Sequence, residues 1–140
     1  MVMKGQASLE YMVMLAISLA IFAAILYATN NLISTSSSQM GVDSAFKAVV
    51  KIKEAADFIY VHGHPSKTQV SVYIPPNIEN ITIDNNNSID VRIAMGQYYT
   101  DIYEVTKGSI YGNLSGLKRE GYYLLNVESQ PDNTINITQA

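Results

Sequence analysis

The sequence predicts an α+β protein in which a long N-terminal α-helix packs against a small antiparallel β-sheet domain. Three observations lead to this prediction. An uncharged apolar run extends from Tyr11 to Ala28. Apolar residues then recur with helical spacing between Ala45 and Ile59. After Pro65 the spacing of apolar residues changes to every second position, which is the period of a half-buried strand.

The composition limits the kinds of protein that this chain can be. A length of 140 residues suits one small domain and one anchor. The net charge of -3 and the scattering of the nine Lys and Arg residues give no basic patch for nucleic acid. There is no cysteine, so disulfides and thiolate metal sites are excluded. The ten tyrosines suit half-exposed sheet faces and contact surfaces, because Tyr has an apolar ring and a polar hydroxyl.

The first element expected is a membrane-spanning helix. The apolar run 11–28 is long enough to cross a bilayer core of about 30 Å, and the next charge after Glu10 is Asp43. The basic residue on its near side is Lys4, so the positive-inside rule places the N-terminus in the cytoplasm and the rest outside. The polar residues after the run, starting at Thr29, do not form a small-residue cleavage site of the secretory kind.

The segment Lys-Gly-Gln-Ala-Ser-Leu-Glu-Tyr at 4–11 resembles the class III signal peptide of archaeal type IV pilin-like proteins. With the apolar helix behind it, the resemblance covers about the first 30 residues. It implies that a membrane prepilin peptidase recognises Lys4 and cuts between Gly5 and Gln6, removing residues 1–5. It also implies a filament core built from the apolar helix at 6–28. The other partners implied are an assembly ATPase, a membrane platform, and copies of this chain or other pilins.

The carboxylate of Glu10 needs a partner in apolar surroundings, where an isolated charge is unfavourable by a few kcal/mol. Glu10 lies one helical turn after Gln6. The resemblance implies that Glu10 pairs with the free N-terminal amine of a neighbouring subunit, which would set the register between subunits. The alternative is that Glu10 lies at headgroup level and is simply hydrated.

Small residues in the apolar run indicate close helix packing. Alanine recurs every four residues at Ala16, Ala20, Ala24 and Ala28. Small side chains at this spacing let helix backbones approach closely. The alternative is that alanine is merely common in membrane helices.

The same helix is expected to continue to about His62, giving one element over 6–62. No proline interrupts the Ser-rich stretch 34–41, where the helix could loosen. One apolar face then follows at Ala45, Val49, Ile52, Ala56 and Ile59. The helix should end before Gly63 and Pro65, because glycine caps helices and proline cannot continue them. His62 and His64 lack a third ligand nearby, so we expect turn residues, no metal and no cofactor.

The remaining residues, 63–140, are expected to form the extracellular sheet domain. Strands are predicted at 70–74, 81–83, 89–95, 98–105, 122–128 and 135–138. Turns are predicted at 84–88 and 131–133, where Asn and Asp tolerate left-handed backbone. The Gly-rich stretch 108–121 is predicted to be mostly loop. Four N-glycosylation sequons fall in this domain, at Asn80, Asn86, Asn113 and Asn136.

No catalytic motif stands out in the sequence, so an enzyme is not expected. The sequence favours a pilin that is first a membrane precursor and then part of an extracellular surface filament for attachment. Two alternatives stay open: a monomeric membrane-anchored extracellular binding protein, and an archaellin-like subunit of a motility filament. For a pilin, it also stays open whether the subunit would be major or minor.

Overall fold

The computed structural model describes the backbone of residues 3–140 and the side chains from Ala7 onward. The chain divides into two compact units, residues 1–37 and residues 38–140. Over the described residues one helix is followed by seven strands, which confirms the predicted α+β class. The leader prediction falls partly on Met1 and Val2, which lie outside the described residues.

Helix α1 spans Met3–His62, so the predicted single helix and its end are confirmed. The Ser-rich stretch 34–41 is helical throughout. The end of the helix follows from local chemistry. Gly63 adopts a φ of +67°, and its N–H donates to the carbonyl of Ile59 at 3.0 Å. This is the left-handed cap that favours glycine, because a side chain is strained in that conformation.

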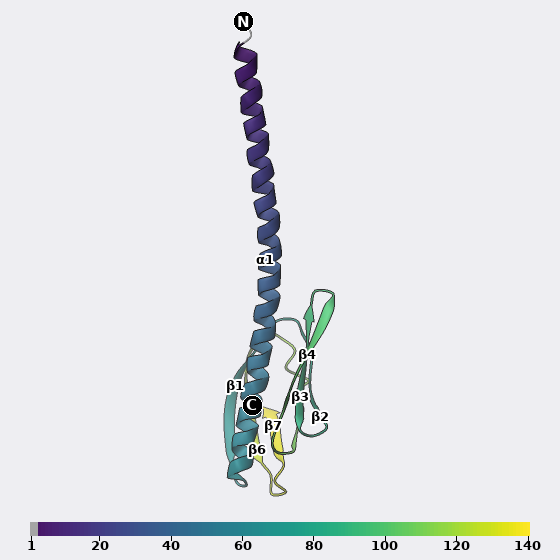
Figure 1. The fold of residues 1–140 in the computed structure, drawn as a ribbon. Helices are drawn as coiled ribbons and strands as arrows, with labels where there is room; N and C mark the ends of the chain where they lie inside the picture. Colours follow the sequence, from purple (N-terminus) through teal and green to yellow (C-terminus); the bar gives the residue numbers. More distant parts are fainter. Residues whose placement is uncertain (1–2) are drawn as a thin grey trace. The chain divides into compact units, whose positions relative to one another are not determined.

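The strands form two sheets within residues 38–140 (Figure 1). Their bounds are β1 (Lys67–Ile74), β2 (Ile78–Asp84), β3 (Ser88–Met95), β4 (Tyr98–Val105), β5 (Ile110–Gly112), β6 (Gly121–Ser129) and β7 (Ile135–Gln139). A three-stranded sheet has the order β2-β3-β4, and a four-stranded sheet has the order β1-β6-β7-β5. All pairs are antiparallel except β5 with β7. The six predicted strands therefore correspond to β1–β4, β6 and β7.

The predicted turns carry the residues that their geometry needs. Asn85 and Asn86 have φ values of 49° and 57° between β2 and β3, and Asn133 has a φ of 66° before β7. Asparagine tolerates this left-handed region better than most residues. Asp84 caps the first turn by accepting a hydrogen bond from the N–H of Asn85 at 3.0 Å. Both turn predictions are confirmed.

The core lies between the back half of α1 and the two sheets. All five residues predicted for the buried helix face are buried, together with Ala48: Ala45, Val49, Ile52, Ala56 and Ile59. On β3 the alternation predicted from sequence holds, with Ile89, Val91 and Ile93 buried. The remaining core residues come from the other strands and from the segment between β5 and β6.

Polar contacts also connect the back half of α1 to the three-stranded sheet. The Nζ of Lys53 donates to Glu104 of β4 at 2.7 Å, and this bond is the main reason that the pKa of Lys53 is raised. Just beyond β4, the N–H of Lys107 donates to the carboxylate of Asp57 at 2.8 Å. These bonds fix one end of β4 to the helix.

The stretch 108–121 differs from the prediction of a loop. It holds the short strand β5, which pairs in parallel with β7, and two buried core residues, Leu114 and Leu117. Three residues are too few to show a period of two, and a parallel partner 25 positions later leaves no local signal. Gly112 is required at the end of β5, because a Cβ there would lie 2.0 Å from the carbonyl oxygen of Ile137.

Candidate assembly site

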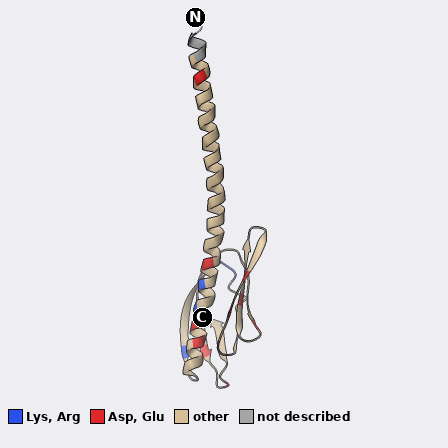
Figure 2. Ribbon diagram, viewed as in Figure 1, with Lys and Arg blue, Asp and Glu red and all other residues tan. Residues whose placement is uncertain are grey.

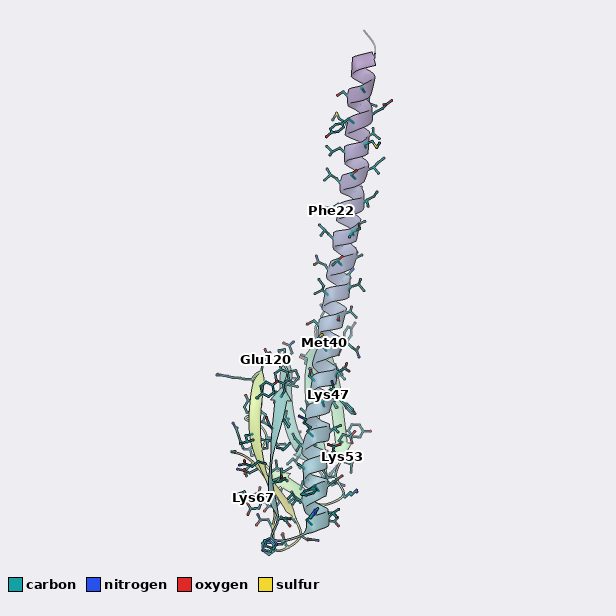
Figure 3. All side chains as sticks on the ribbon, turned by 90° about the vertical axis from the view of Figure 1, so that its left-hand side faces the viewer. Phe22, Met40, Lys47, Lys53, Lys67 and Glu120 are labelled. Carbon is teal, nitrogen blue, oxygen red and sulfur yellow. The ribbon has the colours of Figure 1, made fainter. Side chains whose placement is uncertain are left out.

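The strongest candidate site is the apolar part of α1 within residues 1–37. The large apolar side chains from Leu9 to Tyr27 are between 49% and 73% exposed. Figure 3 shows side chains pointing outward on all sides of this segment, Phe22 among them. A helix that is apolar all round needs surroundings other than water, such as lipid or other helices. The segment could cross a membrane by its length and composition, a property that signal sequences share.

Charge is absent from most of this segment. Figure 2 shows one acidic residue near the start of the described helix and then an uncharged stretch as far as the next acidic residue. These two residues are Glu10 and Asp43. At a rise of about 1.5 Å per residue, the 32 uncharged residues between them extend over about 48 Å. This stretch is longer than a bilayer core of about 30 Å.

The polar groups inside the run are arranged in a way that suits an apolar environment. The hydroxyl of Ser18 donates to the carbonyl of Met14 at 2.8 Å, and the hydroxyl of Thr29 donates to that of Ile25 at 2.8 Å. Such bonds to the preceding turn satisfy a hydroxyl without water. Neither residue therefore prevents the segment from entering lipid or a protein core.

Two tyrosines lie at the two ends of the run. Tyr11 and Tyr27 are 71% and 73% exposed, and 16 helical residues place them about 24 Å apart along the axis. Tyrosine is enriched at the two interfaces of a membrane, where its ring and hydroxyl meet different surroundings. Tyr11 and Tyr27 could have been found from the sequence, because they stand at the first and the next-to-last positions of the apolar run.

Glu10 is exposed on the helix, one turn after Gln6. The backbone of Lys4, Gly5 and Gln6 is helical, but their side chains lie outside the described residues. The pairing of Glu10 with a neighbouring N-terminal amine is an intermolecular contact, so the single chain leaves it as a prediction. What the chain provides is an exposed carboxylate within about 6 Å, along the axis, of the position where the mature chain would begin.

The alanine row is placed on one continuous helix. Each step of four residues turns about 40° beyond a full turn, so Ala16, Ala20, Ala24 and Ala28 follow a shallow spiral about 18 Å long. All four are exposed. A neighbouring helix that crosses at a small angle could follow such a row, since small residues permit close approach.

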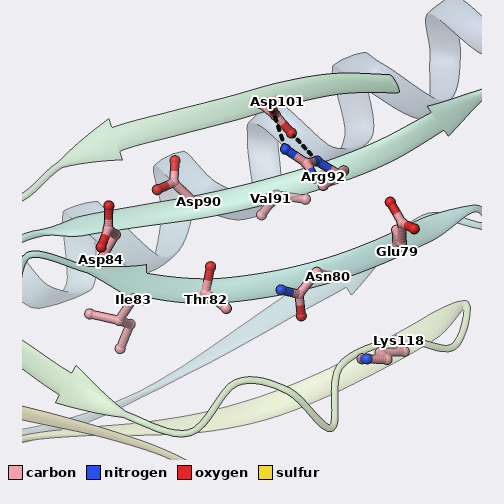
Figure 4. Close-up of a pocket in the computed structure, with 10 residues that line it drawn as sticks. All are labelled: Glu79, Asn80, Thr82, Ile83, Asp84, Asp90, Val91, Arg92, Asp101 and Lys118. Atoms are coloured by element: carbon pink, nitrogen blue, oxygen red, sulfur yellow. Dashed lines mark hydrogen bonds and ion pairs between the residues drawn. The ribbon is translucent and has the colours of Figure 1, made fainter. Parts of the chain in front are cut away.

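A groove on the outer face of the three-stranded sheet is a second candidate site (Figure 4). It has a volume of about 830 Å³, and β2, β3 and β4 line it together with Lys118 from the β5–β6 segment. In its lining, Arg92 of β3 and Asp101 of β4 form a two-point ion pair, with Nε to Oδ1 at 2.7 Å and Nη2 to Oδ2 at 2.9 Å. This bond lowers the pKa of Asp101.

Asp90 also lines the groove, and its pKa is shifted in the opposite direction to that of Asp101. Partial burial raises the pKa of Asp90, and the charges of Asp84 and Asp101 raise it further. The groove also contains Glu79 on its rim. Within the described residues no group of three or more His, Cys, Asp or Glu side chains could hold a metal ion. The groove is a polar surface with an excess of carboxylates.

The two histidines make contacts in different places. His62 Nδ1 lies 2.7 Å from the carbonyl oxygen of Phe58, and its ring lies 4.1 Å from the Phe58 ring by centroids. His64 Nδ1 lies 3.1 Å from the carbonyl oxygen of Ser129, the last residue of β6. Each ring is thus oriented by a different backbone carbonyl.

The sequons differ in how accessible their asparagines are. Asn80, Asn86 and Asn113 are exposed, whereas Asn136 is half-buried on β7, which has a paired strand on each side. The Oδ1 of Asn113 accepts bonds from the N–H of Ser115 at 3.0 Å and from its hydroxyl at 2.6 Å. Asn113 therefore sits in an exposed turn with a fixed orientation.

Comparisons with protein-family models, with curated proteins and with solved structures found no match to this chain. The resemblance of residues 4–11 to a class III signal peptide therefore stands on those residues alone. The structure itself establishes an α+β fold and one helix that could span a membrane.

Proposed function

We propose that this chain is a structural subunit of an archaeal type IV pilus-like surface filament. It enters the membrane as a precursor, loses residues 1–5 and polymerises through its N-terminal helix. The observation that carries this proposal is the apolar segment of α1, whose described side chains are exposed on every side and which has a single acidic residue at one end. Such a segment needs apolar neighbours, and both lipid and copies of itself can supply them.

Glu10 is what makes polymerisation a better explanation than simple anchoring. A single anchor gains nothing from a carboxylate at the mouth of its apolar run. In a filament, the carboxylate can pair with the amine that cleavage after Gly5 creates on a neighbouring chain. Transfer from lipid to a bundle of helices changes the hydrophobic free energy little, because lipid is as apolar as Leu. Ion pairing and close packing at the alanine row would then supply the specificity.

The rest of the chain has a different role in this proposal. Residues 38–140 form a domain with its own core, which would lie outside the cell and cover the filament surface. The proposal includes no catalytic activity and no bound cofactor. The exposed sequons, Asn113 above all, would carry any N-linked glycan. A prepilin peptidase, an assembly ATPase and a membrane platform would be the partners during assembly.

The experiment that tests the proposal compares variants of Glu10 in the cells that make this protein. Glu10→Ala and the isosteric Glu10→Gln should both insert in the membrane and lose the leader, yet give at most about one tenth of the normal filament mass. Glu54→Ala, which removes an exposed carboxylate from the same helix within residues 38–140, is the matched control and should assemble normally. Normal filaments from Glu10→Gln would contradict the pairing.

The groove beneath Arg92 and Asp101 favours a second candidate, a monomeric membrane-anchored binding protein. Its polar groups and its volume of about 830 Å³ would suit a polar ligand. The two candidates differ in the N-terminus of the native protein. Mass spectrometry that finds Gln6 as the first residue supports the filament subunit, and an intact Met1 supports the anchored monomer.

A further inference from the structure

Four strands of the folded domain stand at the edge of a sheet: β2 and β4 in the three-stranded sheet, and β1 and β5 in the four-stranded sheet. Of these, β4 and β1 are both eight residues long. An edge strand presents a row of N–H and C=O groups to which another strand can bond. The edges of β4 and β1 present such rows over equal lengths.

The hydrogen bonds beyond β4 identify which of its residues point to the free edge. The N–H of Thr106 donates to the carbonyl of Asn87 at 2.8 Å, and these two residues continue the β3–β4 register as directly opposite partners. Hydrogen-bonded pairs alternate with non-bonded pairs in antiparallel sheets. Outward-pointing backbone groups therefore belong to Tyr99, Asp101, Tyr103 and Val105. In the part of the chain that the structure describes, these groups have no partner.

The β4 edge lacks two of the features that usually block strand addition, a proline and a bulge, and the one charge among its outward-pointing residues, Asp101, is paired with Arg92 of β3. Its sequence contains no Pro, Lys or Arg, and its eight pairs with β3 run without a register shift. Tyr99 and Tyr103 are 62% and 66% exposed. By contrast, β2 at the other edge of the same sheet has a register shift between Ile78 and Asn80. Natural sheets protect exposed edges with charges, prolines and bulges, so an edge with neither proline nor bulge is open to a strand partner.

The outward-pointing residues of β1 can be identified in the same way. The N–H of Ser129 donates to the carbonyl of Ser66 at 2.9 Å, which continues the β1–β6 register. The outward-pointing residues are therefore Lys67, Gln69, Ser71 and Tyr73. The side chains of Lys67, Gln69 and Ser71 are exposed and that of Tyr73 is half-buried. As on β4, the residues with free backbone groups carry their side chains on the solvent side of the sheet.

We propose that β4 of one copy pairs with β1 of a second copy and joins the two sheets. The geometry favours this partner, because antiparallel pairing of β4 with β1 over all eight residues places outward-pointing residues opposite outward-pointing residues. The same full-length pairing of β4 with another β4 would place Tyr99 opposite Glu104, whose backbone groups bond within the sheet. A contact between two different edges leaves one of each free, so it can repeat without closing. The inference rests on the proposed function, to which it adds a contact between folded domains.

The equal lengths fix the register of the contact. An antiparallel pair that uses all eight residues places Lys67 opposite Val105, Gln69 opposite Tyr103 and Tyr73 opposite Tyr99. Outward-pointing residues then face outward-pointing residues, as hydrogen bonding requires. Side chains on the solvent face of one sheet continue onto the solvent face of the other. The pairing would thus extend the sheet without exposing either core face.

Cysteine cross-linking of full-length protein in native filaments tests this register. Directly opposite residues in a hydrogen-bonded antiparallel pair have Cα atoms about 5.5 Å apart, within the range of a disulfide. The natural chain has no cysteine, so background bonding is absent. Gln69→Cys with Tyr103→Cys should give a ladder of covalent multimers on oxidation, and each single variant should give monomers.

The matched control combines Gln69→Cys with Tyr122→Cys. Tyr122 is 80% exposed, but it lies on β6, which has strands on both sides, so this variant should give no ladder. Dimers from Tyr103→Cys alone would show β4–β4 pairing and overturn the proposal. The proposal would also be overturned if filaments assembled normally but gave no ladder, or gave only the ladder seen with the control. That result would leave the proposed function intact. If the unmodified protein formed no filaments at all, that result would instead contradict the proposed function.

A second variant tests the backbone of the edge itself. Tyr103→Pro removes an N–H that makes no bond inside the sheet, and edge strands accept proline at such positions. It should increase at least tenfold the fraction of subunits that detergent releases from filaments, while Tyr103→Ser, which keeps the N–H, should change it less than threefold. Circular dichroism confirms that both variants are folded. Equal release from the two variants would contradict strand pairing.

Discussion

At the scale of single residues, several groups along α1 have an identified local role. Ser18 and Thr29 satisfy their hydroxyls on the preceding helical turn, and Gly63 provides the left-handed residue that ends α1. Glu10 is the exception, because its carboxylate is exposed on an apolar helix. Its proposed partner belongs to another molecule. The residue that the single chain explains least is thus the one on which assembly would depend.

The charge of Asp90 should reduce the stability of the folded domain at neutral pH. An acid with a raised folded pKa is destabilised when it is ionised, here by partial burial and by Asp84 and Asp101. The cost is present above that raised pKa and disappears below the ordinary value of 3.8. Asp90→Asn should therefore raise the melting temperature at pH 7 and leave it unchanged near pH 3. Thermal unfolding at the two pH values measures this.

Asp101→Asn is the control for Asp90→Asn and should shift the melting temperature at pH 7 in the opposite direction. The bond from Arg92 lowers the pKa of Asp101, so the ionised carboxylate stabilises the fold above pH 4 and this contribution is lost as the pH falls through the folded pKa. Its removal should lower the melting temperature at pH 7. If both substitutions shift the melting temperature in the same direction, the assigned causes are wrong.

Gly112 should tolerate no side chain. Its φ is +149° and an added Cβ would lie 2.0 Å from the carbonyl oxygen of Ile137. Gly112→Ala should therefore lower the free energy of unfolding by about 2–4 kcal/mol, from backbone strain and overpacking. Gly116→Ala is the matched control, since its nearest neighbour is a side-chain oxygen of Gln139 at 3.4 Å. Urea unfolding followed by circular dichroism measures both variants. If β5 were not held against β7, the two variants would lose equal amounts of unfolding free energy.

At the scale of elements, the sequence predicted those with a sustained period. Helix α1, its buried face and strands β1 and β3 each repeat apolar residues over five or more positions, and each was predicted, although β1 begins three residues before the predicted 70–74. The division of the strands into two sheets was not predicted, because strand order depends on contacts between distant residues. Strand β5 was missed for the same reason, since its partner β7 lies far along the chain.

Substitution of Ile52 tests whether the back half of α1 lies at the centre of the core. Its side chain is 1% exposed, so Ile52→Ala should lower the free energy of unfolding by about 2–5 kcal/mol through lost burial and a cavity. Val61→Ala, at a position that is 69% exposed on the same helix, should change it by less than about 0.5 kcal/mol. Unfolding of full-length protein in detergent provides the comparison. Similar effects at both positions would show that the helix does not pack as described.

At the scale of the whole molecule, the two units need different surroundings. Residues 38–140 bury a continuous apolar cluster and can fold in water. The apolar segment of residues 1–37 leaves its side chains exposed and needs lipid or protein around it. This difference could be predicted from the sequence, since it follows from hydropathy. The groove and the edges of β1 and β4 could not, because the groove is lined by residues from several strands and the position of an edge depends on the strand order.

The same contrast explains how far the candidate site could be predicted. The proposed leader, Glu10 and the alanine row are consecutive or regularly spaced, so they can be read from the sequence alone. What they would contact is a property of the proposed assembly, and a single chain does not contain it. The edges of β1 and β4 are a second proposed contact surface, which can be read only from the folded domain.

Imaging of native filaments from the cell surface, at a resolution that traces one subunit, would decide whether this chain polymerises through its N-terminal helix. We predict a filament whose subunits begin at Gln6, whose apolar helices fill the core, and in which the Glu10 carboxylate lies within about 4 Å of a neighbouring N-terminal amine. Protein found only as a monomer in the membrane, with residues 1–5 still attached, would contradict the account.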